Sequence, residues 1–435
     1  MASSSPTEIA EVLDLTLEGA GVVATPEGKR VLVPGALAGE LISFRRQRRR
    51  RNFDEGVLLE VLRPSPERVV PACEYFSRCG GCSLQHLAPA AQLEMKQSAL
   101  LDALQRIGRV RPEQILPPIS ASVWGYRRRA RLAVRHVEKK GRVLVGFRER
   151  EQPRVVDMLS CETIHPAVSR LLPALSDLIG ALSIRARLPQ IEVTVADNAT
   201  ALVLRVLDPP GAHDMALLRE FALTKGVRIY LQPGGPDSVA PLDPLQPDEE
   251  LCYAIPAYGL SLCFGPADFI QVHAEVNLRM IDQAIALLAP VATDRVLDLY
   301  CGIGNFTLPL AAHFDQVIAT ELAKASVQAA RENLDANGID RAVLVPPLVS
   351  GFNNTTSNAY ALDAAQAHPD RFVVMGRFDP RPSDARERLE HWLEQPGMRG
   401  IRLSLEGPPA PQLLEEGALE WAWPIAERLG IAVYF

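Results

Sequence analysis

The chain has 435 residues, of which 47% are hydrophobic and 23% charged, a balance typical of a globular protein with roughly two to four domains. No apolar run approaches the ~20 residues that cross a membrane, and the start lacks a secretory signal, so we expect a cytoplasmic protein with no membrane partner. The net charge of −6 is uneven: residues 1–160 hold 26 Lys+Arg against 18 Asp+Glu, which predicts a polyanionic partner for this part.

Residues 8–64 alternate short apolar segments with Gly-, Pro- and Glu-containing turns about ten residues apart, which predicts a small β-barrel. Near its end, Arg45–Arg51 holds six arginines in seven residues, between Phe44 and Phe53. This run is either a solvated hairpin or an RNA-binding surface. RNA contact is favoured, because unbalanced positive charge repels itself unless phosphates neutralise it. The barrel resembles a TRAM domain, an RNA-binding module similar to the OB-fold.

Four cysteines have the spacing of metal ligands, three in a C-x5-C-G-G-C pattern and one far downstream: Cys73, Cys79, Cys82 and Cys161. Four thiolates suit either tetrahedral zinc or an iron-sulfur cluster. The x5/x2 spacing, the glycine-flanked pair and the remote fourth ligand favour a 4Fe-4S cluster. His86 and His165 are interpreted as polar neighbours rather than ligands. Because four of the seven cysteines have this spacing, disulfides are not expected in the cytoplasm.

Residues 89–108 have apolar positions at helical spacing, which predicts one amphipathic helix. The basic segment Trp124–Arg131 then leads into strands predicted at 132–137 and 142–147. Its aromatic side chains either stack on unpaired bases or belong to the core. Residues 168–265 predict a mixed α/β region that carries no functional motif.

Val296–Asn305 has the pattern of a strand, a tight turn with two glycines, and the start of a helix. After a second predicted strand at 316–320 comes Glu321, which is placed to accept hydrogen bonds from a ribose diol. A single G-x-G disfavours pyrophosphate, so S-adenosylmethionine is favoured over a dinucleotide, because it has no phosphate that needs a helix N-terminus. The alternative is a turn that requires glycine for steric reasons. Upstream, Phe269 and Gln271 offer a ring face and an amide, or form an ordinary strand edge.

In this order, the arginine-rich barrel, the four cysteines and the glycine motif resemble the RNA uracil-C5 methyltransferases. The closest resemblance within them is to the iron-sulfur 23S rRNA (uracil-C5)-methyltransferases of bacteria, over residues 8–340. It implies S-adenosylmethionine and a 4Fe-4S cluster as cofactors, and a single-stranded or loop uridine of 23S ribosomal RNA as substrate. It implies cluster ligation by Cys73, Cys79, Cys82 and Cys161. It implies cofactor binding by Gln271, Tyr300, Asn305 and Glu321. We expect a monomer.

In this family a cysteine thiolate adds to C6 of uracil, C5 takes the methyl group, and a base removes the C5 proton. That cysteine belongs to a C-terminal Ser-Cys-Asn-Pro-x-Thr segment, whereas the last cysteine here is Cys301, inside the glycine turn. Asp379–Pro382 is only superficially similar to the family's Asp-Pro-Pro-Arg loop, and Leu344–Pro347 stands where an adenine-binding acid is expected. Cys252, Cys263 and Cys301 are interpreted as small core side chains. No catalytic residue is assigned, and an inactive or severely impaired enzyme is expected.

Residues 341–435 contain no Lys and no Cys, and their pattern predicts βα repeats. The predicted strands lie at 342–345, 372–375, 400–405 and 431–435, and the predicted helices at 358–367, 384–395 and 413–429. His368–Phe372 and Met398–Leu403 resemble a middle section of metal-dependent amidohydrolases of the TIM-barrel type. His368 and His391 cannot assemble a metal site alone, so an amidohydrolase is the least favoured function. The composition indicates a chimera of two unrelated pieces joined at 338–341.

The predicted fold class is α/β multi-domain. Its parts are a TRAM/OB-like barrel at 8–66, an iron-sulfur and mixed α+β central domain at 67–270, the start of a Rossmann-like methyltransferase domain at 271–340, and a partial TIM-barrel-like βα-repeat tail at 341–435. The favoured function is a uracil-C5 RNA methyltransferase scaffold that lacks its nucleophile. The alternative is a catalytically silent RNA-binding iron-sulfur protein.

Overall fold

The structure is a computed structural model, and it divides the chain into two compact units. The first holds residues 1–195, 200–242 and 272–276, and the second holds the rest. The described residues are 6–434 except 151, 244–249, 290, 292–294, 315, 322, 340–341, 345–357, 359–361, 363–364, 367–368, 370–371, 404–416 and 418. Among the described helices, none has the length and hydropathy to cross a bilayer.

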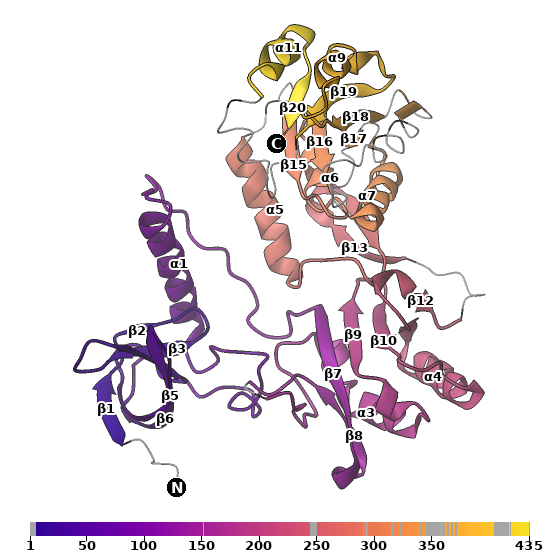
Figure 1. Cartoon of the computed structure of the whole chain (residues 1–435). Coiled ribbons are helices and arrows are strands. Elements are labelled where there is room, and N and C mark those ends of the chain that lie inside the picture. The colour runs from indigo at the N-terminus through magenta and orange to yellow at the C-terminus, as the bar shows by residue number, and fades with distance from the viewer. Residues whose placement is uncertain are drawn as a thin grey trace. The chain divides into compact units, whose positions relative to one another are not determined.

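The first unit begins with a six-stranded sheet in the order β1-β5-β6-β4-β3-β2 (Figure 1). Its strands are β1 (Thr7–Glu11), β2 (Asp14–Leu15), β3 (Ala20–Ala24), β4 (Arg30–Pro34), β5 (Leu41–Arg49) and β6 (Phe53–Arg63). The two edge strands are consecutive in the chain, joined by Val12 and Leu13, whose N–H groups donate to Glu40 and Val22 at 2.8 Å. A sheet whose opposite edges are joined by two residues must curl, and it encloses a core that includes Val31 and Val33.

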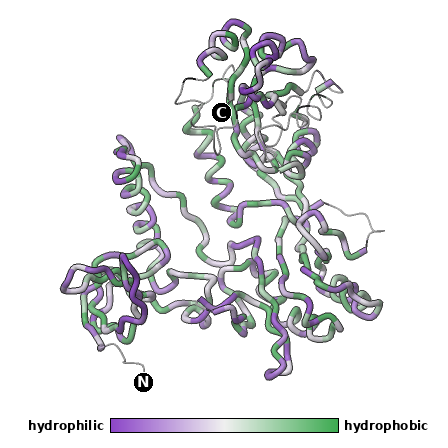
Figure 2. Tube along the Cα trace, in the orientation of Figure 1, coloured by the Kyte–Doolittle hydropathy of each residue, from purple (hydrophilic) through white to green (hydrophobic). Residues whose placement is uncertain are grey.

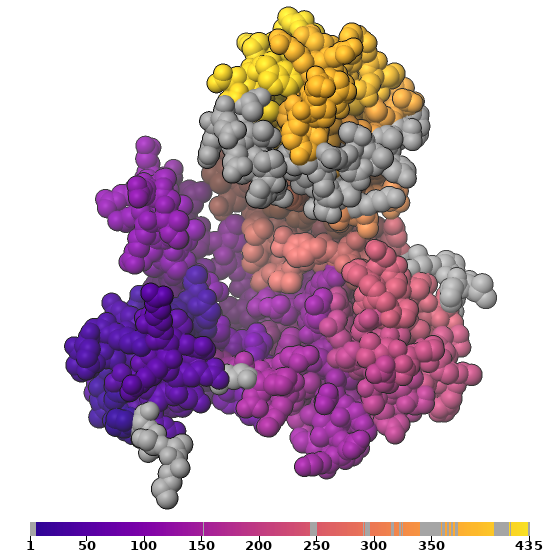
Figure 3. All heavy atoms as spheres, in the orientation of Figure 1, coloured from indigo at the N-terminus to yellow at the C-terminus, as the bar shows by residue number. Residues whose placement is uncertain are grey.

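The arginine-rich run belongs to β5 rather than to a connection, since this strand continues to Arg49. The helix predicted at 89–108 is present as α1 (Pro89–Arg106). None of its residues is buried, and only its first turns, at Ala91 and Met95, contact a small cluster of buried leucines. The atoms of this helix are drawn in purple in the space-filling view (Figure 3).

A second six-stranded sheet, in the order β12-β11-β10-β9-β7-β8, forms the middle of the first unit. Its strands are β7 (Arg129–Val137), β8 (Arg142–Gly146), β9 (Gln190–Val195), β10 (Thr200–Arg205), β11 (Val227–Gln232) and β12 (Ala240–Pro241). Neighbours are antiparallel except β10 and β11. Helices α3 (Leu172–Ala181) and α4 (Ala212–Lys225) pack on it, and β9 and β10 are largely hydrophobic (Figure 2). The predicted strands at 132–137 and 142–147 correspond to β7 and β8.

The second unit holds an antiparallel hairpin and a parallel sheet in the order β15-β16-β17-β18-β19-β20 (Figure 1). The strands are β13 (Leu251–Ile255) and β14 (Leu260–Phe264) in the hairpin, and β15 (Arg295–Leu299), β16 (Gln316–Thr320), β17 (Ala342–Leu344), β18 (Phe372–Arg377), β19 (Met398–Arg402) and β20 (Ala432–Tyr434) in the sheet. Its main helices are α5 (Ala274–Leu288), of which most belongs to this unit, α6 (Thr307–Ala311), α7 (Lys324–Ala336), α9 (Ala385–Glu390) and α11 (Ala422–Leu429).

The strand order agrees with the expected Rossmann-like start at 271–340, where β15 and β16 are adjacent and parallel, and departs from a doubly wound sheet only in the tail. In a doubly wound sheet the order reverses part-way, and the first strand acquires a neighbour on each side. Here each new strand joins the last one, and β18 pairs with β17 through Val373 and Val343. Strand β15 therefore lies at an edge of the described sheet, with Leu297 and Leu299 each 45% exposed.

The tail after residue 341 has a hydrophobic core of its own, which includes Phe378, Leu389, Trp392 and Ile425. Strands β18 and β20 lie where they are predicted, and β19 begins two residues earlier than expected. The helix predicted at 384–395 is α9 followed by a 3-10 turn. Most of the helix predicted at 358–367, together with His368, lies outside the described residues.

Candidate functional site

The glycine turn between β15 and α6 needs a backbone that few side chains tolerate. The φ angles are +60° at Tyr300, +58° at Gly302 and +95° at Gly304. A Cβ atom on Gly304 would collide with the side chain of Leu308. Tyr300 adopts this conformation despite its side chain, which is 72% exposed. A strained and exposed aromatic residue after a parallel strand is typical of a ligand-binding turn.

Glu321 lies beside this turn, as the sequence predicts. Its Oε2 accepts a hydrogen bond from the Gly302 N–H at 2.9 Å, and its Oε1 accepts one from the Ala323 N–H at 2.8 Å. Cys301 donates its N–H to the Thr320 carbonyl at 2.9 Å, which holds the ends of β15 and β16 together. The structure thus brings Tyr300, the glycines and Glu321 to the carboxyl ends of two parallel strands, where open α/β sheets bind their ligands.

Asp298 is the second-to-last residue of strand β15, and its side chain is hydrogen-bonded to the helix that follows. Burial raises its pKa, the nearby Glu321 charge adds to this, and hydrogen bonds from Thr307 oppose it, with a net rise. The Thr307 Oγ1–Asp298 Oδ2 distance is 2.6 Å. This carboxyl group therefore fixes the start of α6.

The side chain of Asn305 is hydrogen-bonded to other residues of the protein. Its Oδ1 accepts from Tyr253 Oη and from Asn277 Nδ2, and its Nδ2 donates to Asn277 Oδ1, each at 2.8 Å. Asn277 is 5% exposed. Gln271 is exposed, and within the described residues no hydrogen bond joins it to Tyr300, Asn305 or Glu321. The amide of Asn305 thus ties the turn to α5 and β13.

Asn333 of α7 and Asn337, the residue directly after this helix, bind the hairpin, and Asn333 also binds the turn; no sequence motif predicts either contact. Asn333 donates Nδ2 to the carbonyls of Cys263 at 2.9 Å and Ile303 at 3.0 Å, and accepts the Cys263 N–H. Asn337, one helical turn later, exchanges two hydrogen bonds with Ser261. Their i, i+4 spacing places both on one helix face, but it does not reveal which strand that face meets.

Replacing Gly304 by Ala should destabilise the second unit by about 2–3 kcal/mol, because a Cβ atom adds a collision with Leu308 to the left-handed backbone. Gly338→Ala is the matched control: Gly338 has a φ of +70° but open space around it, so about 1 kcal/mol is expected. Urea unfolding followed by tryptophan fluorescence measures the difference, since Trp392, Trp421 and Trp423 all lie in this unit. Equal losses would contradict close packing under the turn.

The three cysteines outside the predicted cluster behave in two ways. Cys252 and Cys263 face each other across the hairpin and form a disulfide, which corrects the expectation that the chain has none. The physical reason is their register: opposed residues of an antiparallel pair bring their side chains together on one face. Cys301 is free, and burial, with the charges of Asp298 and Glu321, raises its pKa to about 12.

The four predicted metal ligands gather in the first unit. Cys79 and Cys161 are buried, and Thr163 Oγ1 lies 3.3 Å from Cys161 Sγ and 3.9 Å from Cys82 Sγ. Burial raises the pKa of both Cys73 and Cys79, and the neighbouring thiols Cys161 and Cys82 raise each pKa further. Within the described part of the chain, however, no three His, Cys, Asp or Glu side chains are arranged tightly enough to hold a metal ion.

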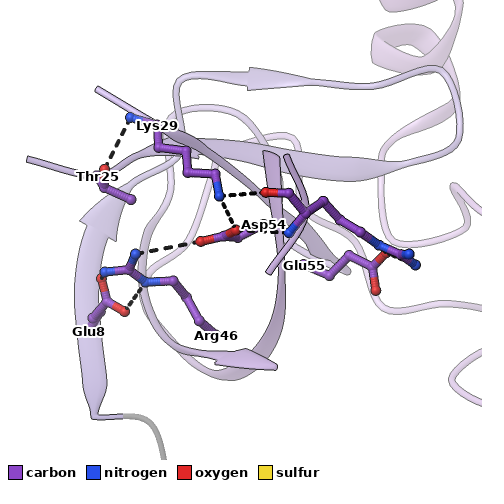
Figure 4. Close-up of polar contacts among 7 residues, drawn as sticks. Glu8, Thr25, Lys29, Arg46, Asp54 and Glu55 are labelled. Carbon is purple, nitrogen blue, oxygen red and sulfur yellow. Dashed lines mark hydrogen bonds and ion pairs between the residues drawn. The ribbon is translucent and has the colours of Figure 1, made fainter. Parts of the chain in front are cut away.

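The arginine run is less unbalanced than its sequence suggests (Figure 4). Arg46 binds Glu8 through Nε at 2.6 Å and Nη2 at 2.8 Å, and lies 3.6 Å from the buried Asp54, which also pairs with Lys29 at 2.6 Å. Glu55 pairs with two further members of the run, Arg48 and Arg50. Three exposed arginines have no ion pair with any described residue: Arg45, Arg49 and Arg51. Three of the six arginines of the run thus have an acidic partner within the protein.

The chain matches two families over its C-terminal part. Residues 262–354 match the family described as tRNA (Uracil-5-)-methyltransferase, and residues 319–435 match the family described as Amidohydrolase. Among solved structures, the Pyrococcus abyssi tRNA (uracil-54, C5)-methyltransferase in complex with S-adenosyl-L-homocysteine covers 85% of this chain. The match spans 90% of that chain at a TM-score of 0.58 and 19% identity, so the two proteins share a methyltransferase-like fold.

Curated relatives match much more of the sequence. The 23S rRNA (uracil(1939)-C(5))-methyltransferase RlmD of Ralstonia nicotianae is 45% identical over 382 residues, covering 87% of this chain and 81% of the relative, so this match extends past residue 341. The protein of the same name from Burkholderia pseudomallei is 48% identical over 331 residues, covering 75% of this chain and 71% of the relative. With this identity over more than two thirds of the relative's length, the chain belongs to the 23S rRNA (uracil-C5)-methyltransferase family.

Proposed function

We propose that the chain binds S-adenosylmethionine at the carboxyl ends of β15 and β16, with Glu321 accepting hydrogen bonds from the ribose diol. Its carboxylate already accepts one N–H from the glycine turn, so it lies where the backbone lets a ligand approach. Tyr300 offers an exposed ring face, Asn305 holds the turn in place, and Gln271 is an exposed amide. When bound, S-adenosylmethionine supplies an electrophilic methyl group.

The four cysteines of the first unit are proposed to ligate a 4Fe-4S cluster. The support is the chemistry of the donors rather than the arrangement of their side chains, because partly buried thiols that raise one another's pKa become stable thiolates only beside a cationic centre. Gly81 lies between two of the ligands, and a Cβ there would come within 3.4 Å of Cys79 Sγ. Ligation by these four cysteines would join the segment 73–82 to Cys161. Zinc remains the alternative occupant of a four-thiolate site.

The N-terminal curled sheet is proposed to act as a TRAM-like module for a single-stranded or loop region of 23S ribosomal RNA. The support is the set of exposed arginines without an ion pair: Arg45, Arg49 and Arg51. Ion pairs with Glu8 and Glu55 fix the intervening arginines and thereby orient the strand that carries this set. Phosphate contacts of this kind give affinity and orientation rather than sequence specificity.

The proposal does not include methyl transfer, because with the cluster bound it leaves none of the seven cysteines available as a nucleophile. Four are the proposed cluster ligands, two form the hairpin disulfide, and Cys301 has a pKa of about 12. Incubation with unmodified 23S rRNA and labelled S-adenosylmethionine tests it.

The amidohydrolase alternative is excluded on a different ground, the lack of histidine ligands for its metal. In the described part of the tail the histidine is His391, which is exposed and paired with Glu394 at 2.8 Å.

A chimeric origin of the tail is also proposed. The support is its match to the Amidohydrolase family from residue 319 and the one-directional order of its strands, as in one sector of a βα barrel. The match to the Ralstonia protein continues past residue 341, which is an argument against a chimeric origin.

Replacing the three unpaired arginines by Ala should flatten the slope of log affinity against log salt by about 2, since each phosphate contact on a single strand contributes ~0.7. The triple variant is Arg45→Ala, Arg49→Ala and Arg51→Ala. A control of equal charge removes three exposed arginines that have acidic partners outside the N-terminal sheet: Arg106, Arg142 and Arg187. Fluorescence anisotropy with a labelled single-stranded RNA measures both slopes. Equal slopes in the two variants would mean that β5 contacts no phosphate.

A further inference from the structure

We infer that a cavity beside the cysteine segment of the first unit binds one unstacked nucleotide of the RNA. The cavity has a volume of about 580 Å³, within the range of small-molecule pockets. One wall comes from the curled sheet, at Gly35 and Leu58. Another part of the lining comes from the five residues between the first two cysteines, which contribute Phe76, Ser77 and Arg78. This inference rests on the proposed RNA-binding function and adds a base-binding contact to it.

The cavity has a rigid wall on which a base can stack. The Arg150 guanidinium lies 4.7 Å from the centre of the Phe76 ring, and the His86 ring lies 5.4 Å from Phe76. Arg150 is fixed there because it donates to the carbonyls of Phe76 at 3.2 Å, Cys79 at 3.2 Å and Cys82 at 2.6 Å. Aromatic rings and guanidinium planes are the surfaces on which proteins stack unpaired RNA bases.

His86 supplies the polar contacts that such a base would need. It is 2% exposed and lines the cavity, yet neither of its ring nitrogens has a hydrogen-bond partner among the described residues. Leaving both buried and unpaired costs free energy, which a ligand could recover. Burial, with the charges of Arg68 and Arg150, lowers its pKa to about 4. The ring is therefore neutral at pH 7 and offers one donor and one acceptor, as the edge of a nucleobase requires.

The rim of the cavity suits a phosphate. Arg78 is 64% exposed and pairs with Glu149 at 2.9 Å, a contact that solvent weakens and a phosphate can replace. Arg68 is not available in this way, because it is bound to the buried Glu40 at 2.5 Å. A stacking wall, a neutral donor–acceptor pair and one exchangeable arginine together match a nucleotide better than an acidic peptide, which would leave the aromatic wall unused.

The test uses the full chain and an oligouridine of about 12 nucleotides, a length that an OB-type module can cover, with 4-thiouridine at scattered positions. Irradiation should cross-link this RNA to the peptide that contains Phe76 and His86. By anisotropy, Phe76→Leu and Arg78→Ala should each weaken binding about tenfold. Arg187→Ala is the matched control, since Arg187 is 53% exposed and pairs with Asp208 at 2.9 Å, and it should change affinity less than twofold.

Thermal unfolding of Phe76→Leu checks that this variant is folded. If Phe76→Leu does not fold, Arg78→Ala still tests the pocket, because Arg78 is exposed. Cross-links elsewhere, with unchanged affinity in Arg78→Ala, would overturn the pocket while leaving RNA binding intact. Failure of the unaltered chain to bind the oligonucleotide would instead overturn the proposed RNA-binding function itself.

Discussion

Purified chain incubated with unmodified 23S rRNA and methyl-labelled S-adenosylmethionine should form no 5-methyluridine. C5 of uracil is too weak a nucleophile to take a methyl group until a thiolate has added to C6. Removing the nucleophile from a covalent mechanism lowers the rate by roughly 10⁴-fold or more, which places turnover below detection. Binding of S-adenosylhomocysteine, measured by calorimetry, should persist, because Glu321 and the glycine turn are in place.

Cys301 is the thiol that could overturn this expectation, and its surroundings oppose such a role. A pKa of about 12 leaves only about 10⁻⁵ of the group as thiolate at pH 7. The same shift fixes the pH dependence: because burial and two carboxylates raise the pKa, any reaction through Cys301 would be absent at pH 7 and would rise as the pH approaches 12. The disulfide withholds Cys252 and Cys263 unless a dithiol reduces it.

Two variants make the turnover experiment decisive. Glu321→Ala should lose S-adenosylhomocysteine binding, whereas Cys301→Ala should retain it, which verifies that the cofactor site is intact in the inactive protein. Labelled 5-methyluridine that depends on Glu321 and disappears in Cys301→Ala would refute the prediction and identify an unexpected nucleophile. Product that appears only after reduction would point to Cys252 or Cys263.

Local features of the fold could be predicted from the sequence because they depend on neighbouring residues. Strand β16 spans Gln316–Thr320 as predicted, and Glu321 reaches the glycine turn because two parallel strands end at the same edge. The order of the later strands could not be predicted, since periodicity identifies a strand but not its neighbour. Likewise, the run Arg45–Arg51 looks unbalanced because its partners Glu8 and Asp54 come from other strands.

In the candidate site, too, the features that depend on neighbouring residues could be predicted, and those that depend on distant residues could not. Tyr300 and Glu321 were predictable because the motif and its following strand contain them, whereas the partners of Asn305 were not. Tyr253 lies 52 residues away and Asn277 lies 28 residues away, on a strand and a helix that the fold alone brings to the turn. A lone asparagine in an amphipathic helix carries no sign of such a role, because most of them face solvent.

Replacing Cys161 by Ser should reduce the iron content of anaerobically purified protein from about four atoms per chain to near zero, with loss of its brown colour. Cys161 is 7% exposed and lies far from the other three ligands in sequence, so through the proposed cluster it would add a link to the hydrogen bonds from Arg150 that already hold the segment 73–82. Without it, three thiolates cannot complete the coordination of a cubane cluster. Iron analysis and visible absorbance measure the effect.

Cys301→Ser is the control, because it removes a free thiol that is not a proposed ligand and should keep full iron. Since a metal centre that joins distant segments contributes its binding energy to folding, Cys161→Ser should also speed proteolysis within 73–82, whereas the control should not. Stoichiometric zinc without iron in the unaltered chain would contradict the cluster and favour a tetrahedral four-cysteine site, since zinc needs the same thiolates but gives no colour. Iron that survives in Cys161→Ser would contradict the remote ligand and leave the three cysteines of 73–82 to find their fourth partner elsewhere.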